Sequence, residues 1–200
     1  MVTRGFFGRR HPEPPRPIPP GQYLENGFPV LSAGPTPRVP LDSWSFSLEY
    51  KGEKLASWTW DQVKALPQTE LTVDIHCVTK WSKLDTKWKG VTIDDFLSAA
   101  GIEPPTAYTM AFCDGGYTTN VPLADLTGGK SMVAFEYDDQ PLHPDHGGPA
   151  RLFVPHLYLW KSAKWLRGLR FIEQDEPGFW ERYGYHMYGD PWKEQRYWND

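Results

Sequence analysis

The chain has 200 residues, of which 40% are hydrophobic and 15% aromatic, so it is long enough to bury the core of one domain. Its net charge of −4 argues against bulk binding of nucleic acid or of an anionic membrane. No run of about 18 apolar residues occurs, so we expect no membrane span. Two cysteines cannot build a disulfide framework, which fits a reducing compartment and predicts a cytoplasmic protein. Arg9-Arg10 is similar to an export signal, but prolines follow where an apolar region would be needed.

Proline is concentrated at the beginning of the chain, where ten of the twenty prolines lie within residues 1–40. Proline fixes φ and has no N–H donor, so this stretch cannot form a helix or a central strand. We predict an extended N-terminal arm over residues 1–40, with a disordered tip and a later part, 28–40, that packs on the domain.

A globular pattern begins at Trp44 and continues to about residue 175. Alternation of apolar and polar residues predicts strands, and Thr59 and Thr92 are placed to cap two short helices. The expected strands are 44–50, 107–113, 131–137, 151–154, 166–173 and one over Leu71, Val73 and Ile75 that ends at His76-Cys77; the expected helices are 60–66 and a second that runs to Ala100.

Many short strands, few helices and no regular βαβ alternation predict an α+β domain over residues 41–175 with mixed β-sheets. The last 22 residues hold eight aromatic side chains together with Gly184, Gly189 and Pro191. We therefore expect residues 176–200 to be an ordered loop that packs on the domain.

Cys77 is the first candidate for chemistry because it follows a strand, with Lys80 nearby to favour a thiolate. A thiolate serves as a nucleophile or as a soft metal ligand, although a free cysteine is most often a small buried hydrophobe. His76 is a poor catalytic partner, since adjacent strand residues point to opposite faces. His143 and His146 could suggest zinc, but no paired cysteine spacing supplies four ligands, so a surface loop explains His143 better.

A second candidate is the polar cluster 145–151 followed by Lys161, Ser162 and Lys164. Arginine, lysine and hydroxyl groups at this density could bind an anion, and two neighbouring tryptophans could stack on a flat heterocycle. A solvated charged face and tryptophans in the core remain the commoner explanations.

Three segments together resemble the molybdopterin-binding domain of the sulfite oxidase family: HCVTKWSKLDTKWKGVTIDDFL, AFCDGGYTTNVPL and MVAFEYDDQPLHPDHGGPARLFVPHLYLWKSAKWLRGLRF. The resemblance extends from about Phe28 to Glu173. The Cys-Val-x-x-Trp-Ser and Trp-Lys-Ser-x-Lys runs are most similar to the catalytic subunit of bacterial protein-methionine-sulfoxide reductase.

The resemblance implies a molybdenum-molybdopterin cofactor with Cys77 as the protein thiolate on molybdenum. It implies pterin contacts from His146 and Arg151, and a phosphate site formed by Lys161, Ser162, Ala163 and Lys164. Cys113 lies where the family contacts the pterin or the rim of the site, and we expect a backbone contact there rather than a second thiolate.

The implied activity is oxygen-atom transfer on a sulfoxide or another small oxo substrate, with electrons exchanged with a separate electron-transfer protein. Two alternatives remain: a non-catalytic binding module of the same fold, and a true sulfite oxidase. Sulfite oxidases carry an arginine and a histidine where this chain has Leu31 and Ala33, and a tyrosine near the position of Phe179-Trp180. Loss of a cation from a dry pocket costs about 2–4 kcal/mol in anion binding, which favours a neutral substrate over sulfite.

Overall fold

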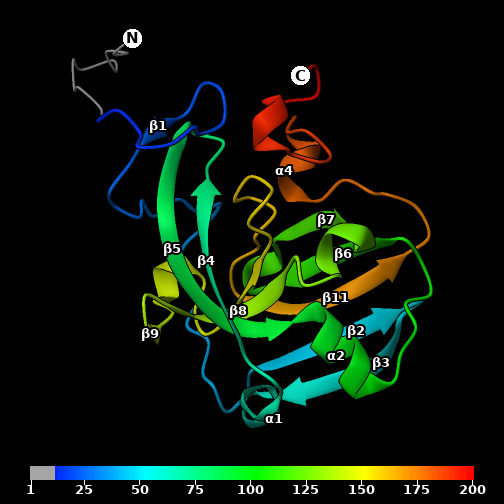
Figure 1. The fold of residues 1–200 in the computed structure, drawn as a ribbon. Helices are drawn as coiled ribbons and strands as arrows, with labels where there is room; N and C mark the ends of the chain where they lie inside the picture. Colours follow the sequence, from blue (N-terminus) through cyan, green and yellow to red (C-terminus); the bar gives the residue numbers. More distant parts are fainter. Residues whose placement is uncertain (1–11) are drawn as a thin grey trace.

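The computed structural model describes residues 12–200 and contains two β-sheets with four short helices (Figure 1). The α+β class predicted from the sequence is confirmed. The six-stranded sheet consists of β1 (Tyr23–Leu24), β4 (Thr69–His76), β5 (Trp81–Thr92), β8 (Met132–Tyr137), β9 (Gln140–Pro141) and β10 (Arg151–Phe153). The five-stranded sheet consists of β2 (Ser45–Tyr50), β3 (Glu53–Thr59), β6 (Tyr108–Cys113), β7 (Thr118–Pro122) and β11 (Leu166–Ile172).

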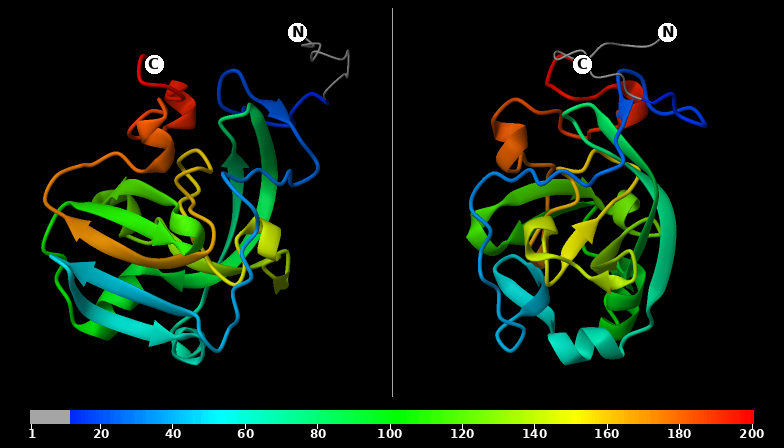
Figure 2. Two further views of the ribbon diagram at one scale, coloured as in Figure 1. Left: turned by 180° about the vertical axis from the view of Figure 1, so that it is seen from behind. Right: turned by 90° about the vertical axis from the view of Figure 1, so that its left-hand side faces the viewer.

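The six-stranded sheet is built on the long, curved hairpin of β4 and β5, which extends along one side of the molecule (Figures 1 and 2). On its other edge β5 pairs with β8, which in turn pairs with β10. The hairpin turn is tight, because the amide of Cys77 donates to the carbonyl of Trp81 and the amide of Lys80 to that of Cys77. The turn is short, since Trp81 and Ser82 already belong to β5.

The five-stranded sheet has the order β3-β2-β11-β6-β7, with β11 parallel to β2 and antiparallel to β6. Strands β3 and β7, which the sequence analysis did not anticipate, form its two edges. Apolar side chains from both sheets and from α2 (Ile93–Ala100) fill one core, for example Phe46, Leu48, Phe96 and Leu152, all fully buried.

The capping residues expected from the sequence set the limits of the two longer helices. Thr59 and Gln62 form a capping box at the start of α1 (Trp60–Ala65), which ends before Pro67. The side chain of Thr92 accepts from the amide of Asp95 at the start of α2, and Gly101, with φ of 64°, ends it. The other helices, α3 (Leu123–Leu126) and α4 (Phe179–Arg182), are single turns. None of the helices in the described part of the chain is long and apolar enough to span a bilayer.

The N-terminal segment follows the β4–β5 hairpin as an extended chain with one short strand, β1. Arg16 forms ion pairs with Asp74 and Asp85 of the hairpin at 2.6 and 2.8 Å. The amide nitrogen of the Gln22 side chain donates to the carbonyl of Cys77 at 3.1 Å. The arm thus contacts both strands of the hairpin and the turn at Cys77. Its expected disordered tip lies outside the described residues.

The C-terminal segment lies at the same end of the hairpin as β1 (Figure 1). It contains α4, a bridge between Tyr185 and Tyr197, and a 3-10 turn at Pro191–Lys193. The guanidinium of Arg196 donates to the carbonyl of Pro20 at 3.1 Å, so the two terminal segments contact each other.

Candidate active site

Cys77 lies directly after β4, and its side chain is 7% exposed. Its Sγ accepts a hydrogen bond from Oγ1 of Thr79 at 3.1 Å. Burial raises the pKa of the Cys77 thiol, while this hydrogen bond and the charge of Lys164 act in the opposite direction. His76 is engaged elsewhere, with Nδ1 at 2.8 Å from Oγ of Ser82, as expected for neighbours on opposite faces of a strand.

His146 ends a 3-10 turn, Pro144–His146, that approaches the site from the loop after β9. Its ring stacks on Phe28 of the N-terminal arm, with centroids 3.9 Å apart and planes 10° apart. Burial, together with the charges of Arg151 and Lys164, lowers the pKa of His146 to about 4, so the ring is neutral at pH 7. Its Nδ1 is buried and has no hydrogen-bond partner.

Arg151 is the first residue of β10 and is 2% exposed. Its Nη1 donates to the carbonyl of His146 at 2.9 Å and its Nη2 to the carbonyl of Ser162, while its buried Nε has no partner. Among the described residues, the groups that act on the pKa of Arg151 are Tyr117, Cys113 and Cys77, and none of them is an aspartate or glutamate. Burial consequently lowers the pKa of Arg151 to about 10.

Lys164 completes this group. Its Nζ donates to the carbonyl of Asp145 at 2.6 Å and to that of Leu31 at 2.7 Å. Burial and the neighbouring charge of Arg151 lower the pKa of Lys164 to about 8, while Asp145 and Cys77 oppose this shift. Lys164 acts on the pKa of Cys77, Cys77 acts on the pKa of Arg151, and both Arg151 and Cys77 act on the pKa of Lys164, so we treat this thiol and these two cations as one electrostatic group.

Ser162 and Ala163 fix the backbone beside this group. Oγ of Ser162 accepts from the amide of Val154 at 2.9 Å, and the carbonyl of Ala163 accepts from the amide of Leu152 at 2.9 Å. Lys161 is different, because its Nζ contacts Oε1 of Glu181 at 2.6 Å in an ion pair with both side chains fully buried. Of the two lysines, the structure therefore places the ammonium of Lys164 in the group with Arg151 and Cys77, and the ammonium of Lys161 against Glu181.

Cys113 is the last residue of β6 and is 9% exposed. Burial raises the pKa of its thiol well above the usual value, and the charge of Arg151 opposes this shift. Its amide donates to the carbonyl of Tyr117 at 3.1 Å. Cys113 thus lies near Arg151 as a neutral thiol.

Sequence reasoning missed three side chains of this region: Phe28, Thr79 and Tyr185. Phe28 lies in the proline-rich arm, where no periodicity marks it, and Thr79 belongs to a turn. The ring of Tyr185 is stacked on Trp180, and burial, Tyr197 and Cys77 all raise the pKa of its hydroxyl. The density of aromatic residues after 176 indicated packing but did not indicate which ring lies near Cys77.

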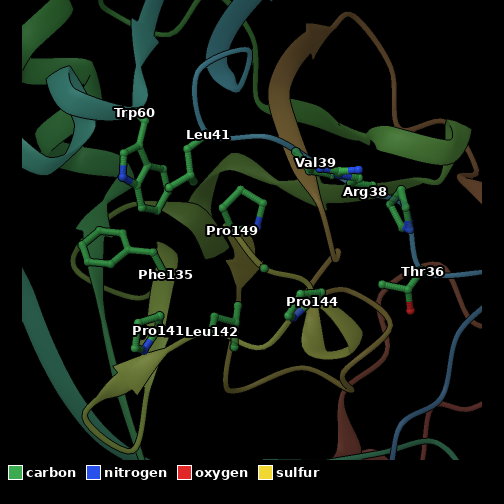
Figure 3. A pocket seen from close by; sticks show the side chains of 12 residues that line it. Thr36, Arg38, Val39, Leu41, Trp60, Phe135, Pro141, Leu142, Pro144 and Pro149 are labelled. Carbon is green, nitrogen blue, oxygen red and sulfur yellow. The ribbon is translucent and has the colours of Figure 1, made fainter.

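An open cavity of about 500 Å³ lies beside the turn that carries His146 (Figure 3). Trp60, Phe135 and Pro149 line its apolar walls and Arg38 lies at one side. A second cavity, of about 430 Å³, is lined by Asp125 and His156 among others. Neither of these two cavities is lined by Cys77 or Arg151.

Among solved structures, the fold is similar to that of the sulfane dehydrogenase SoxCD from Paracoccus pantotrophus. The TM-score is 0.62 at 18% sequence identity, over 74% of this chain and 42% of that chain. This similarity shows a shared fold.

The chain belongs to the oxidoreductase molybdopterin binding domain family, whose model matches residues 33–180. It is 42% identical over 194 residues to the uncharacterized oxidoreductase YuiH of Bacillus subtilis (strain 168), covering 96% of this chain and 98% of that protein. It is 30% identical over 177 residues to the putative protein-methionine-sulfoxide reductase subunit YedZ1 of Azospira oryzae, covering 86% of this chain and 67% of that protein.

These findings confirm the sulfite-oxidase-type molybdopterin domain that the sequence motifs indicated. The protein is a molybdopterin-dependent oxidoreductase.

Proposed function

We propose that Cys77 binds the molybdenum and that the enzyme transfers an oxygen atom to or from a small neutral oxo substrate, a sulfoxide being the favoured class. The observation that carries the proposal is the buried Cys77 thiol, which lies in the same cluster of buried side chains as Trp88. The guanidinium of Arg151 lies over the ring of Trp88, 5.7 Å from its centroid, and the charge of Lys164 acts on the pKa of Cys77. When bound, the cofactor supplies two-electron oxygen-atom transfer, and the protein supplies placement and electrostatics.

The residues present fit a molybdopterin cofactor. Nδ1 of His146 and Nε of Arg151 are buried polar atoms without partners, and such atoms are rare unless a ligand or water completes them. A pterin offers ring nitrogens and oxygens for both. A soft thiolate suits a high-valent metal that is also held by dithiolene sulfur. Arg151, a buried cation without a carboxylate partner, suits an anionic group.

Within this proposal the predicted site residues have distinct roles. Arg151 and Lys164 bind the anionic part of the cofactor, His146 contacts the pterin, and Ser162 and Ala163 hold the backbone that orients Arg151. Cys113 contributes packing and backbone near Arg151 and no metal bond. Lys161 is excluded from direct phosphate contact, because its ammonium is already surrounded by protein oxygens.

Leu31 and Ala33 support a neutral substrate rather than sulfite. The arm does reach the site at this position, since the carbonyl of Leu31 accepts from Lys164, but the Leu31 side chain is apolar and 48% exposed. It therefore offers no charge to an anionic substrate. The reductase subunit to which the chain is 30% identical is named for a protein methionine sulfoxide activity, which supports the same class.

We further propose that electrons come from a separate redox protein and that the enzyme acts in the cytoplasm. The similarity to a protein named as a reductase subunit supports a redox partner. Cys77 and Cys113 are both free thiols, which supports a reducing compartment.

The test is to express the full chain in a host that makes the cofactor and to measure molybdenum and pterin per chain. We expect about one of each, loss of molybdenum in Cys77→Ala, and retention in the control Cys113→Ser. Equal loss in both variants would remove Cys77 as the specific ligand.

A substrate panel with artificial electron donors and acceptors then decides the activity. Reduction of sulfoxides with little sulfite oxidation supports the proposal, whereas efficient sulfite oxidation makes the protein a true sulfite oxidase. A loaded protein inert to sulfoxides, N-oxides and sulfite would be a binding module.

A further inference from the structure

The buried ion pair of Lys161 and Glu181 has no role in the chemistry proposed above. Both side chains are fully buried, with Nζ of Lys161 at 2.6 Å from Oε1 of Glu181. The same Nζ donates to the side-chain and main-chain oxygens of Asn120 at 2.7 and 2.9 Å and to the carbonyl of Met187 at 2.6 Å. One ammonium group therefore has four oxygen neighbours, more than its three N–H bonds.

Glu181 connects further elements to the same point. Its Oε1 also accepts from Nε1 of Trp160 at 2.9 Å and from Oγ1 of Thr119 at 2.8 Å, and its main-chain carbonyl accepts from Nε1 of Trp198 at 2.9 Å. The pair thus joins β7, the turn at residues 158–164, helix α4 and the end of the chain. We name these contacts the Lys161–Glu181 cluster.

The cluster lies directly behind the groups proposed to hold the cofactor. Lys161 precedes Ser162, whose carbonyl accepts from the guanidinium of Arg151. The turn itself is held by two backbone bonds, from the amide of Lys161 to Tyr158 and from the amide of Ser162 to Leu159. A shift of the backbone at Lys161 would therefore also shift the carbonyl of Ser162 that accepts from Arg151.

We infer that Glu181 is a positioning residue which, through Lys161, holds the turn at residues 158–164 in the geometry that retains the cofactor. The inference rests on the proposed function, in which Arg151 and Lys164 bind the anionic part of the cofactor. It makes the C-terminal segment a support of the cofactor site, because Glu181 contacts Lys161.

The physical basis is the cost of displacing a buried charge. A buried ion pair contributes little net stability compared with apolar side chains of similar size, but removal of one partner leaves an uncompensated charge. The lowest free energy then requires Lys161 to stay within hydrogen-bonding distance of all its oxygens. The ion pair thus restricts the turn to one position, whereas an apolar pair would fill the same volume but would not hold the side chain of residue 161 in one orientation.

The experiment compares Glu181→Gln and the double variant Lys161→Met/Glu181→Leu with the control Leu48→Ala. Leu48 is fully buried in β2 among the apolar side chains of the main core, so its truncation lowers the melting temperature without removing a bond of the cluster. Two quantities are measured: amide hydrogen exchange at Lys161 and Ser162 in the cofactor-free protein, and the rate of pterin release from the loaded protein, followed by pterin fluorescence.

In Glu181→Gln we expect both amides to exchange at least about tenfold faster than in the control, and pterin to be released about 10–100-fold faster, the usual range for loss of an indirect support. The double variant should regain much of the melting temperature but keep the fast release. A purely structural pair would instead show release rates that follow the melting temperature in all variants, and unchanged exchange at the two amides would also overturn the inference.

The two proposals fail in different ways. A wild-type protein that contains no pterin when made in a competent host refutes the proposed function. The exchange measurement on the cofactor-free chain still decides whether Glu181 holds the turn.

Discussion

Two buried cations only ten residues apart in sequence are treated differently by the fold. Lys161 is surrounded by a carboxylate, an amide oxygen and two carbonyls, and its charge is compensated within the protein. Arg151 contacts two carbonyls and no carboxylate, and its Nε is buried without a partner. The charge of Lys161 therefore has a carboxylate counter-charge within the protein, whereas the charge of Arg151 has none among the described residues, which fits the anionic ligand proposed above. Burial and charge alone therefore do not distinguish a structural cation from a binding cation; its partners do.

The largest effect is expected for Lys161→Met. The substitution leaves the carboxylate of Glu181 buried without its counter-charge, so the free energy of unfolding should fall by about 3–5 kcal/mol. Urea denaturation of the cofactor-free protein measures this. The matched control is Lys164→Met, which removes hydrogen bonds from a partly exposed ammonium to two carbonyls and should cost about 1 kcal/mol. Equal losses in the two variants would contradict the difference between the two lysines.

Phe28→Ala tests whether packing of the N-terminal arm on His146 stabilises the region around Arg151. Phe28 stacks on His146 and also contacts Trp81 and Trp88, and it is half-buried, so its truncation should cost about 2 kcal/mol. Phe28→Leu retains apolar volume without the flat ring and should cost less. Denaturant unfolding of both variants would show a stability equal to wild type if the arm did not pack on His146.

Arg151→Met should change the stability of the cofactor-free protein by no more than about 1 kcal/mol, because lost hydrogen bonds are offset by removal of a desolvated charge. Pterin content after purification should nevertheless fall strongly. Urea denaturation and pterin content are measured on the same preparation, and the expected result, a small change in stability with a large loss of pterin, contrasts with the large loss of stability expected for Lys161→Met. A cost comparable to that of Lys161→Met would mean that Arg151 is a structural cation.

A further expected effect is on the pH dependence of stability. Burial lowers the pKa of His76 and of His146 from 6.5 to about 4 in the folded protein. Between these values the unfolded chain binds protons that the native protein does not, so stability is fully present above pH 6.5 and falls as the pH drops towards 4. His146→Gln should make this decline shallower. The free energy of unfolding is measured by urea unfolding at several pH values. If its slope against pH is the same in His146→Gln as in the wild type, the pKa of His146 is not lowered in the folded protein.

The sequence predicted the elements whose signals are local. Capping residues predicted both longer helices, period-two alternation predicted β2 and β4, and β6, β8, β10 and β11 were also predicted within one or two residues. Strand β5 was missed because it carries the charged residues Lys83, Asp85 and Lys87, which a neighbouring strand stabilises. Lys87 and Lys89, for example, pair with Glu70 on β4. Edge strand β3 is mostly exposed and so lacks the alternation of a half-buried strand.

For the site, motif resemblance identified the family and the segments but not the partner of each side chain. Arg151, Lys161 and Lys164 look equivalent in the sequence, since each is a cation beside small residues. Their partners distinguish them: Lys161 contacts Glu181, and Lys164 donates to the carbonyls of Asp145 and Leu31. Glu181 and Leu31 are distant in the sequence from the lysines that they contact. Phe28 was missed for the same reason, because its stacking on His146 is a contact between residues 118 positions apart.

The central position of β11 has a consequence for biosynthesis. Strands β2 and β6 do not pair with each other, and both pair with β11, which is made more than a hundred residues after β2. A nascent chain that has not yet exposed residues 166–172 from the ribosome carries two strands with open edges. Open edges of this kind invite pairing with other chains. Release of a chain that stops before β11 should therefore yield aggregates.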